Sequence, residues 1–252
     1  MVSPRGPWRW LRWVIAAVVV IAVLAVAGPY VFFHFIEGNG PAPLSLKASP
    51  SSSTSTSTST STPGAQSASP VSSQGSSAPV AGTWAVRSGS RVGYRVNEVL
   101  GGQSHTAVGR SSSVTGQMVI KGTTVKTAGF TVKMATIHTD SAQRDSQFDG
   151  RIMDVARYPD GTFTLTRPIA LAPVPAVGTV KTYSATGHLT LHGQTRSVTF
   201  PVKTELTAGG IEVQGSIPVL FSRWDIPNPS FTGFVTTQNH GIMEFLLDFR
   251  PA

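Results

Sequence analysis

From about residue 82 to the end of the chain, apolar and polar residues alternate in short runs. Successive side chains of a β-strand point to opposite faces, so this period of two predicts strands that are buried on one side. The eight runs are Val92–Val96, Met118–Ile120, Phe130–Met134, Phe163–Leu165, Leu189–Leu191, Val198–Val202, Ile211–Val219 and Met243–Phe249. The pattern predicts an all-β fold of eight antiparallel strands, and by itself it leaves a sandwich and a closed barrel equally open.

A polar stretch that follows the third run has the features of a short helical insert. Asp140 and Gln143 are three residues apart, the spacing of a capping box, which predicts that a helix begins there. Phe148 and Ile152 are four residues apart and share one helical face. Gly150 lies between them and weakens the helix in its middle. We therefore expect one or two turns of helix on each side of this glycine.

The start of the chain has the pattern of a membrane-spanning segment. The run Val14–Ile36 carries no charge and is long enough to cross the hydrocarbon core of a bilayer. Three arginines precede it: Arg5, Arg9 and Arg12. The positive-inside rule then predicts a cytoplasmic segment 1–12, a single transmembrane helix at 13–36 and an extracytoplasmic remainder. The alternative is a signal peptide cleaved near Ala27, and the length of the apolar run favours the retained anchor.

Residues 37–80 have the composition of a linker. Residues 51–62 consist of Ser and Thr alone, and Pro50 and Pro63 flank them. Such a stretch has too little apolar surface to offset the entropy of ordering it, which predicts a disordered spacer. The organisation expected from the sequence is an anchor, a linker and one folded domain at 81–252.

Composition and charge exclude several classes of function. The chain has no cysteine, so disulfides, thiolate metal sites and a lipidated cysteine are all excluded. The net charge is +8, and the basic residues are spread along the domain rather than clustered. This spread argues against a nucleic-acid partner, whereas it suits a weak attraction to anionic lipid headgroups.

The polar residues form no recognisable catalytic or metal-binding group. His188 and His192 are four residues apart, which on a strand separates their Cα atoms by about 13 Å, too far for a shared metal. His138 lies near two aspartates in a loop, where a partly exposed polar turn is the simpler interpretation. Arg144 and Asp145 belong to a charged stretch that we interpret as a solvated helix face with weak ion pairs. We therefore predict a protein that is not an enzyme and holds no metal.

Two groups of residues resemble the markers of a known family. The first comprises Asp140–Asp145, Phe148, Met153–Val155, Tyr158–Pro159 and Thr162–Phe163, and the second is Ala185–Val198. They are similar to the YceI-like family of polyisoprenoid-binding, lipocalin-like proteins of bacterial envelopes, and with Gly116 and Val92–Val96 the resemblance covers about residues 81–250. It implies that the strands form a lipocalin-like barrel rather than a sandwich.

The resemblance further implies a hydrophobic cavity that holds an isoprenoid or another long apolar lipid. The residues expected to line it are Val92, Tyr94, Val96, Met118, Phe130, Val132, Met134, Phe148, Ile152, Phe163, Leu165, Leu189, Trp224, Phe231 and Phe245. The insert 141–157 and the aromatic segment 221–234 are expected to form a lid over its mouth. The alternative is a filled barrel that acts as a structural or stress-response adaptor of the envelope, and the sequence leaves open whether the barrel forms a homodimer.

Overall fold

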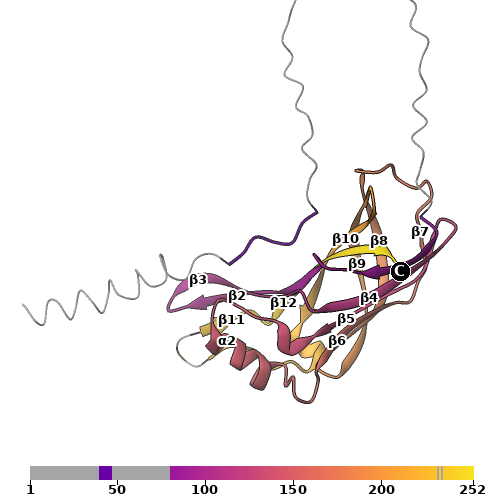
Figure 1. Cartoon of the computed structure of the whole chain (residues 1–252). Helices are drawn as coiled ribbons and strands as arrows, with labels where there is room; N and C mark the ends of the chain where they lie inside the picture. The colour runs from indigo at the N-terminus through magenta and orange to yellow at the C-terminus, as the bar shows by residue number, and fades with distance from the viewer. Residues whose placement is uncertain (1–39, 47–79, 232, 234) are drawn as a thin grey trace, which may run out of the picture. The chain divides into compact units, whose positions relative to one another are not determined.

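Each of the eight alternating runs lies in a separate β-strand, except that Met134 at the end of the third run falls just past its strand. The strands form a single antiparallel sheet (Figure 1). The computed structural model describes residues 40–46 and 80–252 except 232 and 234. The strands are β1 Gly82–Val86, β2 Arg91–Leu100, β3 Gln103–Ser111, β4 Val114–Lys121, β5 Thr124–Lys133, β6 Asp160–Leu165, β7 Ile169–Ala170, β8 Val180–Leu191, β9 Gln194–Thr207, β10 Gly210–Leu220, β11 Val235–Thr237 and β12 His240–Pro251. The predicted all-β fold is confirmed.

The sheet closes on itself. Within the described residues, eight strands follow one another around the barrel in the order β1, β4, β5, β6, β8, β9, β10 and β12. Pairing of β1 with β12, from Trp84 opposite Pro251 to Val86 opposite Phe249, completes the circuit. The long hairpin β2–β3 pairs with β12 and extends one side of the wall. Closure decides between the two folds that the alternation left open, and it gives the barrel that the family resemblance implied.

Alternation along the strands builds the core. On β5, Phe130 and Val132 are buried while Lys133 is exposed. On β12, Phe245, Leu247 and Phe249 are each at most 3% exposed. Burial of such large apolar side chains stabilises the fold by roughly 1.5–3 kcal/mol each. The inward rows of the strands therefore supply the core that holds the barrel closed.

Four phenylalanine rings meet inside the barrel: Phe130, Phe163, Phe200 and Phe245. Neighbouring ring centroids lie 5.1–6.0 Å apart around a closed circuit, within the range of favourable aromatic pairs. Two glycines on inward rows make room for them. A Cβ on Gly187 would lie 2.5 Å from the Phe163 ring, and one on Gly215 would lie 2.4 Å from the Phe245 ring. We call these four side chains the phenylalanine ring.

The two family markers contact each other at the tip of the β8–β9 hairpin. His192 and Gly193 form its two-residue turn with φ of 48° and 72°, as a type I′ turn requires. Tyr158 packs edge-on against His192 at 4.8 Å and also covers Gly193, where a Cβ would lie 2.4 Å from the tyrosine ring. The first marker is thus held against the second by one aromatic contact.

The insert between β5 and β6 is helical, as predicted, but it begins differently. A 3-10 turn at Met134–Thr136 leads to helix α2, Ala142–Gln147, and a π-helical turn at Phe148–Ile152 that contains Gly150. The N-cap is Ser141, whose hydroxyl accepts a hydrogen bond from Arg144 N at 3.4 Å. The expected capping box of Asp140 and Gln143 is therefore wrong, because the shorter serine side chain takes the capping position.

The predicted membrane span at 13–36 and most of the predicted linker lie outside the described residues. Within the described part, residues 40–46 form neither helix nor strand. No helix of the described residues combines the length and the apolar character that crossing a bilayer requires.

Substituting Gly187 should disturb the phenylalanine ring. We expect Gly187→Ala to lower the free energy of unfolding by about 1–3 kcal/mol, because the methyl group overlaps the Phe163 ring and the Thr164 carbonyl oxygen. Gly150→Ala is the control, since no atom lies within 4 Å of its Cβ, and it should be neutral or slightly stabilising. Urea unfolding of both variants measures the difference, and equal midpoints would contradict the packing described.

Candidate functional site

A cavity of about 130 Å³ lies on one side of the phenylalanine ring. Inward residues of the barrel strands form most of its wall, including Val92, Val132 and Leu189. The insert closes part of it with Phe148, Ile152 and Met153, and the segment that follows β10 contributes Phe221, Ile226 and Pro229. Its lining is apolar almost throughout, so the space suits a hydrocarbon group rather than a polar one.

The two covering segments are tied to each other. Arg151 on the insert donates hydrogen bonds to the carbonyl oxygens of Asn228 at 3.2 Å and Pro229 at 3.1 Å. The segment after β10 starts with a 3-10 turn, Phe221–Trp224, in which Trp224 is fully buried and donates to Leu189 O at 3.3 Å. Arg151 therefore joins the two segments into one lid, and the hydrogen bond from Trp224 to Leu189 attaches this lid to β8.

Tyr94 links the barrel wall to the lid. Its ring stacks on Phe148 with a centroid distance of 5.1 Å and an interplanar angle of 10°. Burial raises the pKa of the Tyr94 phenol well above its ordinary value, which already lies above physiological pH. The wall therefore presents a neutral phenol beside the apolar space.

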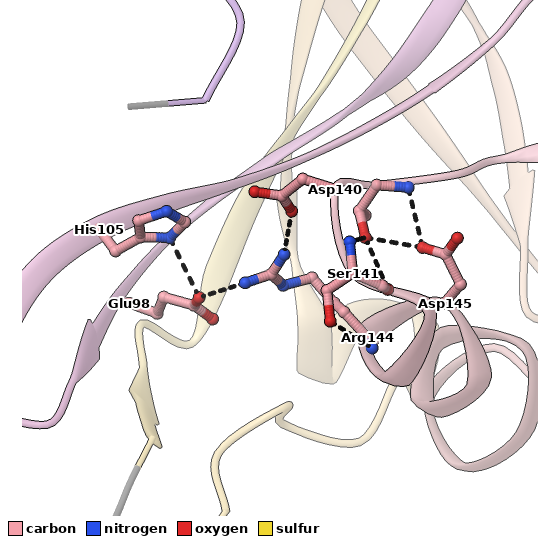
Figure 2. A network of polar contacts seen from close by, with 7 residues as sticks. Glu98, His105, Asp140, Ser141, Arg144 and Asp145 are labelled. Atoms are coloured by element: carbon pink, nitrogen blue, oxygen red, sulfur yellow. Dashed lines mark hydrogen bonds and ion pairs between the residues drawn. The ribbon is translucent and has the colours of Figure 1, made fainter. Parts of the chain in front are cut away.

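A group of charged side chains lies where α2 meets β2 (Figure 2). Glu98 Oε1 is 3.3 Å from Arg144 Nη2 and 3.3 Å from His105 Nδ1, and Arg144 also pairs with Asp140. The Glu98 side chain is 8% exposed and that of Arg144 is 17% exposed, and both residues contribute to the cavity wall. This polar group gives the otherwise apolar cavity one charged end.

Arg144 and Asp145 differ from the solvated helix face that the sequence indicated. Arg144 reaches across to the barrel, and Asp145 faces the loop before the helix. Asp145 Oδ1 accepts hydrogen bonds from Thr139 N at 2.8 Å and Thr139 Oγ1 at 2.7 Å, and Oδ2 is 3.2 Å from His138 Nδ1. Desolvation alone would raise the pKa of Asp145, but these hydrogen bonds outweigh it and lower the pKa. The expectation of a solvated face is corrected for both residues.

A second cavity, of about 80 Å³, lies on the other side of the phenylalanine ring. Phe130 and Phe245 belong to the walls of both cavities, whereas Phe163 and Phe200 border only the smaller one. The first two rings are thus the partition between the cavities, and 5.1 Å separates their centroids.

Most of the predicted lining residues border one of these spaces. The larger cavity contains Val92, Tyr94, Val96, Phe130, Val132, Met134, Phe148, Ile152, Leu189 and Phe245. The smaller one contains Met118, Phe163 and Leu165, in addition to the two shared phenylalanines. Trp224 is buried elsewhere and Phe231 is 64% exposed, so the expectation that they line the cavity is corrected. That the remaining residues contact a ligand stays a prediction.

Sequence reasoning missed the charged end of the cavity. Glu98 and His105 lie on β2 and β3, opposite each other in the register, and a two-residue turn at Gly101–Gly102 separates their strands. An acidic residue at the inward position of an otherwise apolar alternation, Val92, Tyr94, Val96, Glu98, is the signal that could have found it. Within the residues that the structure describes, no three His, Cys, Asp or Glu side chains come close enough to hold a metal ion.

Comparison with known proteins places the chain in a family. The family model described as the YceI-like domain matches residues 84–245, and the chain belongs to this family. A comparison with curated proteins gives no match.

Two solved structures have a similar fold. A polyisoprenoid-binding domain from Saccharophagus degradans is 16% identical, with a TM-score of 0.56 over 67% of this chain and 98% of that one. BcnA from Burkholderia cenocepacia is 22% identical, with a TM-score of 0.51 over 65% of this chain and 98% of that one. At these identities the likeness concerns the fold, which agrees with the barrel.

The loop contacts of Asp145 give a pH-dependent prediction. Asp145→Ala should lower the free energy of unfolding at pH 7 by about 1–3 kcal/mol, because Thr139 loses its acceptor in a partly buried loop. The folded pKa is lowered, so this stabilisation is complete above the ordinary value of 3.8 and is lost as the pH falls through the folded pKa. The difference between the two proteins in urea unfolding should shrink in that acidic range.

Asp140→Ala is the matched control for this experiment, because Asp140 is the half-exposed partner of Arg144. It should cost less than about 1 kcal/mol. A difference between wild type and Asp145→Ala that is equally large at pH 7 and pH 2 would contradict the role of the carboxylate.

Proposed function

We propose that the barrel binds the apolar chain of an isoprenoid-type lipid without catalysing a reaction, and that it transports or stores this lipid. The observation that carries the proposal is the larger cavity, whose wall is mostly apolar and includes the ion pair of Glu98 and Arg144. Membership of the YceI-like family and the fold shared with a polyisoprenoid-binding domain support it. The hydrocarbon lies among the inward side chains, and a polar headgroup lies toward Glu98 and Arg144.

The volume of the larger cavity limits the length of the lipid chain that fits without a movement of the protein. An engineered protein cavity of about 150 Å³ is known to hold one benzene molecule. The larger cavity, at about 130 Å³, therefore has room for about one isoprene unit in this closed form. A longer chain enters only when the lid or the phenylalanine ring moves. Burial of each CH₂ group contributes about 0.8 kcal/mol to the binding free energy. Each further isoprene unit therefore adds binding free energy that can offset the cost of moving the lid or the rings.

The small volume is also the observation that favours the alternative function, a filled barrel that acts as a structural or stress-response adaptor of the envelope. The two proposals differ in one property, which is the uptake of an apolar ligand.

For its location, we propose the outer face of the cytoplasmic membrane. The support is the uncharged run 14–36 with arginines on its N-terminal side, which suits a single span with a cytoplasmic N-terminus. In this location the barrel can exchange lipid with the bilayer that anchors it.

Uptake of isoprenols tests the function. We expect the full chain to bind farnesol, measured by equilibrium partition of the radiolabelled alcohol, with one molecule bound per barrel. Ile152→Trp should reduce the affinity about tenfold or more, because Ile152 is a partly buried residue of the lid and the larger side chain fills the cavity. Ile169→Trp is the matched control in the smaller cavity and should leave farnesol binding nearly unchanged. Wild-type protein that binds no isoprenol would support the filled barrel.

The partition predicts a preference for chain length. Phe245→Leu removes one of the two rings that separate the cavities, so the affinity for geranylgeraniol relative to geraniol should rise, by about tenfold. Phe200→Leu is the control, because Phe200 borders the smaller cavity alone and should change this ratio less. A competition series with geraniol, farnesol and geranylgeraniol measures the ratio. Equal ratios in all three proteins would show that the partition does not limit the chain.

A further inference from the structure

A buried carboxylate lies on the outer side of the barrel wall. Glu244 alternates with the inward Met243 and Phe245 along β12, yet its side chain is only 3% exposed. Its Oε1 is 2.9 Å from Arg95 Nε, and Arg110 Nη2 pairs with the same oxygen. Because one oxygen takes both guanidinium groups, Oε2 stays available as an acceptor for a further donor. We call these three residues the outer ion cluster.

The register of three strands builds this cluster. Gly93 on β2 lies between Glu244 on β12 and Arg110 on β3, opposite both. A Cβ on Gly93 would lie 2.9 Å from Arg110 Nη1. The absence of a side chain at Gly93 therefore leaves space for the Arg110 side chain to cross β2 and reach the carboxylate. Arg110 Nη1 also donates to the carbonyl oxygens of Tyr94 at 3.3 Å and Gly109 at 3.1 Å. These hydrogen bonds to backbone carbonyls fix the position of the Arg110 guanidinium on the sheet.

A segment from the N-terminal part of the chain occupies the cluster. Leu44 N donates a hydrogen bond to Glu244 Oε2 at 3.0 Å, and Arg95 Nη2 donates to Pro41 O. Both bonds use backbone groups of the segment, at two points three residues apart. The second oxygen of the buried carboxylate and one guanidinium thus bind backbone groups of one short stretch of peptide.

The sequence of this segment suits such binding. Residues 41–46 read PAPLSL, with prolines at positions 41 and 43. Proline fixes its own φ and biases the residue before it toward extended conformations. The segment therefore loses little conformational entropy when it is bound in an extended form. Pro43 has no N–H, so Leu44 supplies the first backbone donor after it.

We propose that the outer ion cluster is a docking site for residues 41–46 of the same chain, which fastens the chain that precedes the barrel to the side formed by β2, β3 and β12. The proposal is independent of the ligand in the cavity. It has a geometric consequence for the proposed anchor. The apolar run ends at Ile36, and five residues span at most about 18 Å. Attachment at Pro41 shortens the tether between the proposed span and the barrel, whereas attachment at residue 80 alone would allow a far longer reach.

Leu44→Pro tests the docking without touching the barrel. It removes the N–H that Glu244 accepts and keeps the segment extended. Ser45→Pro is the matched control, because it also adds a proline next to this position but removes an N–H for which no hydrogen bond is found in the described structure. The chain has no native cysteine, so Ala42→Cys and Val99→Cys introduce two unique positions for spin labels, both exposed.

The distance between the two labels is measured by pulsed electron paramagnetic resonance on the full chain in lipid nanodiscs. We expect one narrow, short distance in the parent protein and in Ser45→Pro, and a broad, longer distribution in Leu44→Pro. A broad distribution in the parent protein, or an unchanged narrow one in Leu44→Pro, would overturn the proposal. Loss of the short distance when labelled chains are diluted with unlabelled ones would assign the segment to a neighbouring chain instead.

Energy transfer measures the consequence for the membrane in the same proteins. A fluorophore at Val99→Cys should transfer energy to acceptor-labelled lipid headgroups more efficiently in the docked forms than in Leu44→Pro. Equal transfer in all forms would show that docking does not set the distance of the barrel from the bilayer. Farnesol binding should be the same in all these proteins, so a failure of the docking proposal is distinguishable from a failure of the lipid-binding proposal.

Discussion

The packing of four phenylalanine rings at the centre of the barrel is the constraint on which the rest of the interior depends. Phe130, Phe163, Phe200 and Phe245 come from four different strands, and their contacts fix how those strands face each other. Gly187 and Gly215 supply the space that the rings need. Because aromatic side chains pack as closely as this, Phe130 and Phe245 separate the larger cavity from the smaller one.

The insert and the segment after β10 supply both apolar residues to the larger cavity and polar contacts around it. Their apolar residues face the hydrocarbon space, while Arg144 binds Glu98 on the barrel and Arg151 binds the segment after β10. The insert contributes Phe148, Ile152 and Met153 to the wall of this cavity. The family markers concentrate in this insert and in the β8–β9 hairpin, which contact each other through Tyr158 and His192.

Much of the fold could be predicted from the sequence, because burial on one side of a strand leaves a period of two. All eight runs fall on separate strands apart from Met134, and Phe130 and Val132 face inward as expected. The pairing of Glu98 with Arg144 could not be predicted, since the two residues are 46 positions apart and meet only in the folded chain. The expectation that Phe231 lines the cavity is wrong for a different reason. Aromatic side chains are buried on average, but the loop that carries Phe231 turns its side chain outward.

Native mass spectrometry of the full chain, purified from the membranes in which it is expressed, shows whether this interior holds a lipid chain. Lipid extraction of the same sample identifies any bound molecule. We expect a stoichiometric adduct with the mass of an isoprenoid, which is lost in Ile152→Trp and retained in Ile169→Trp. Protein that carries no adduct, and takes up none when isoprenoids are added, would contradict lipid binding by the barrel.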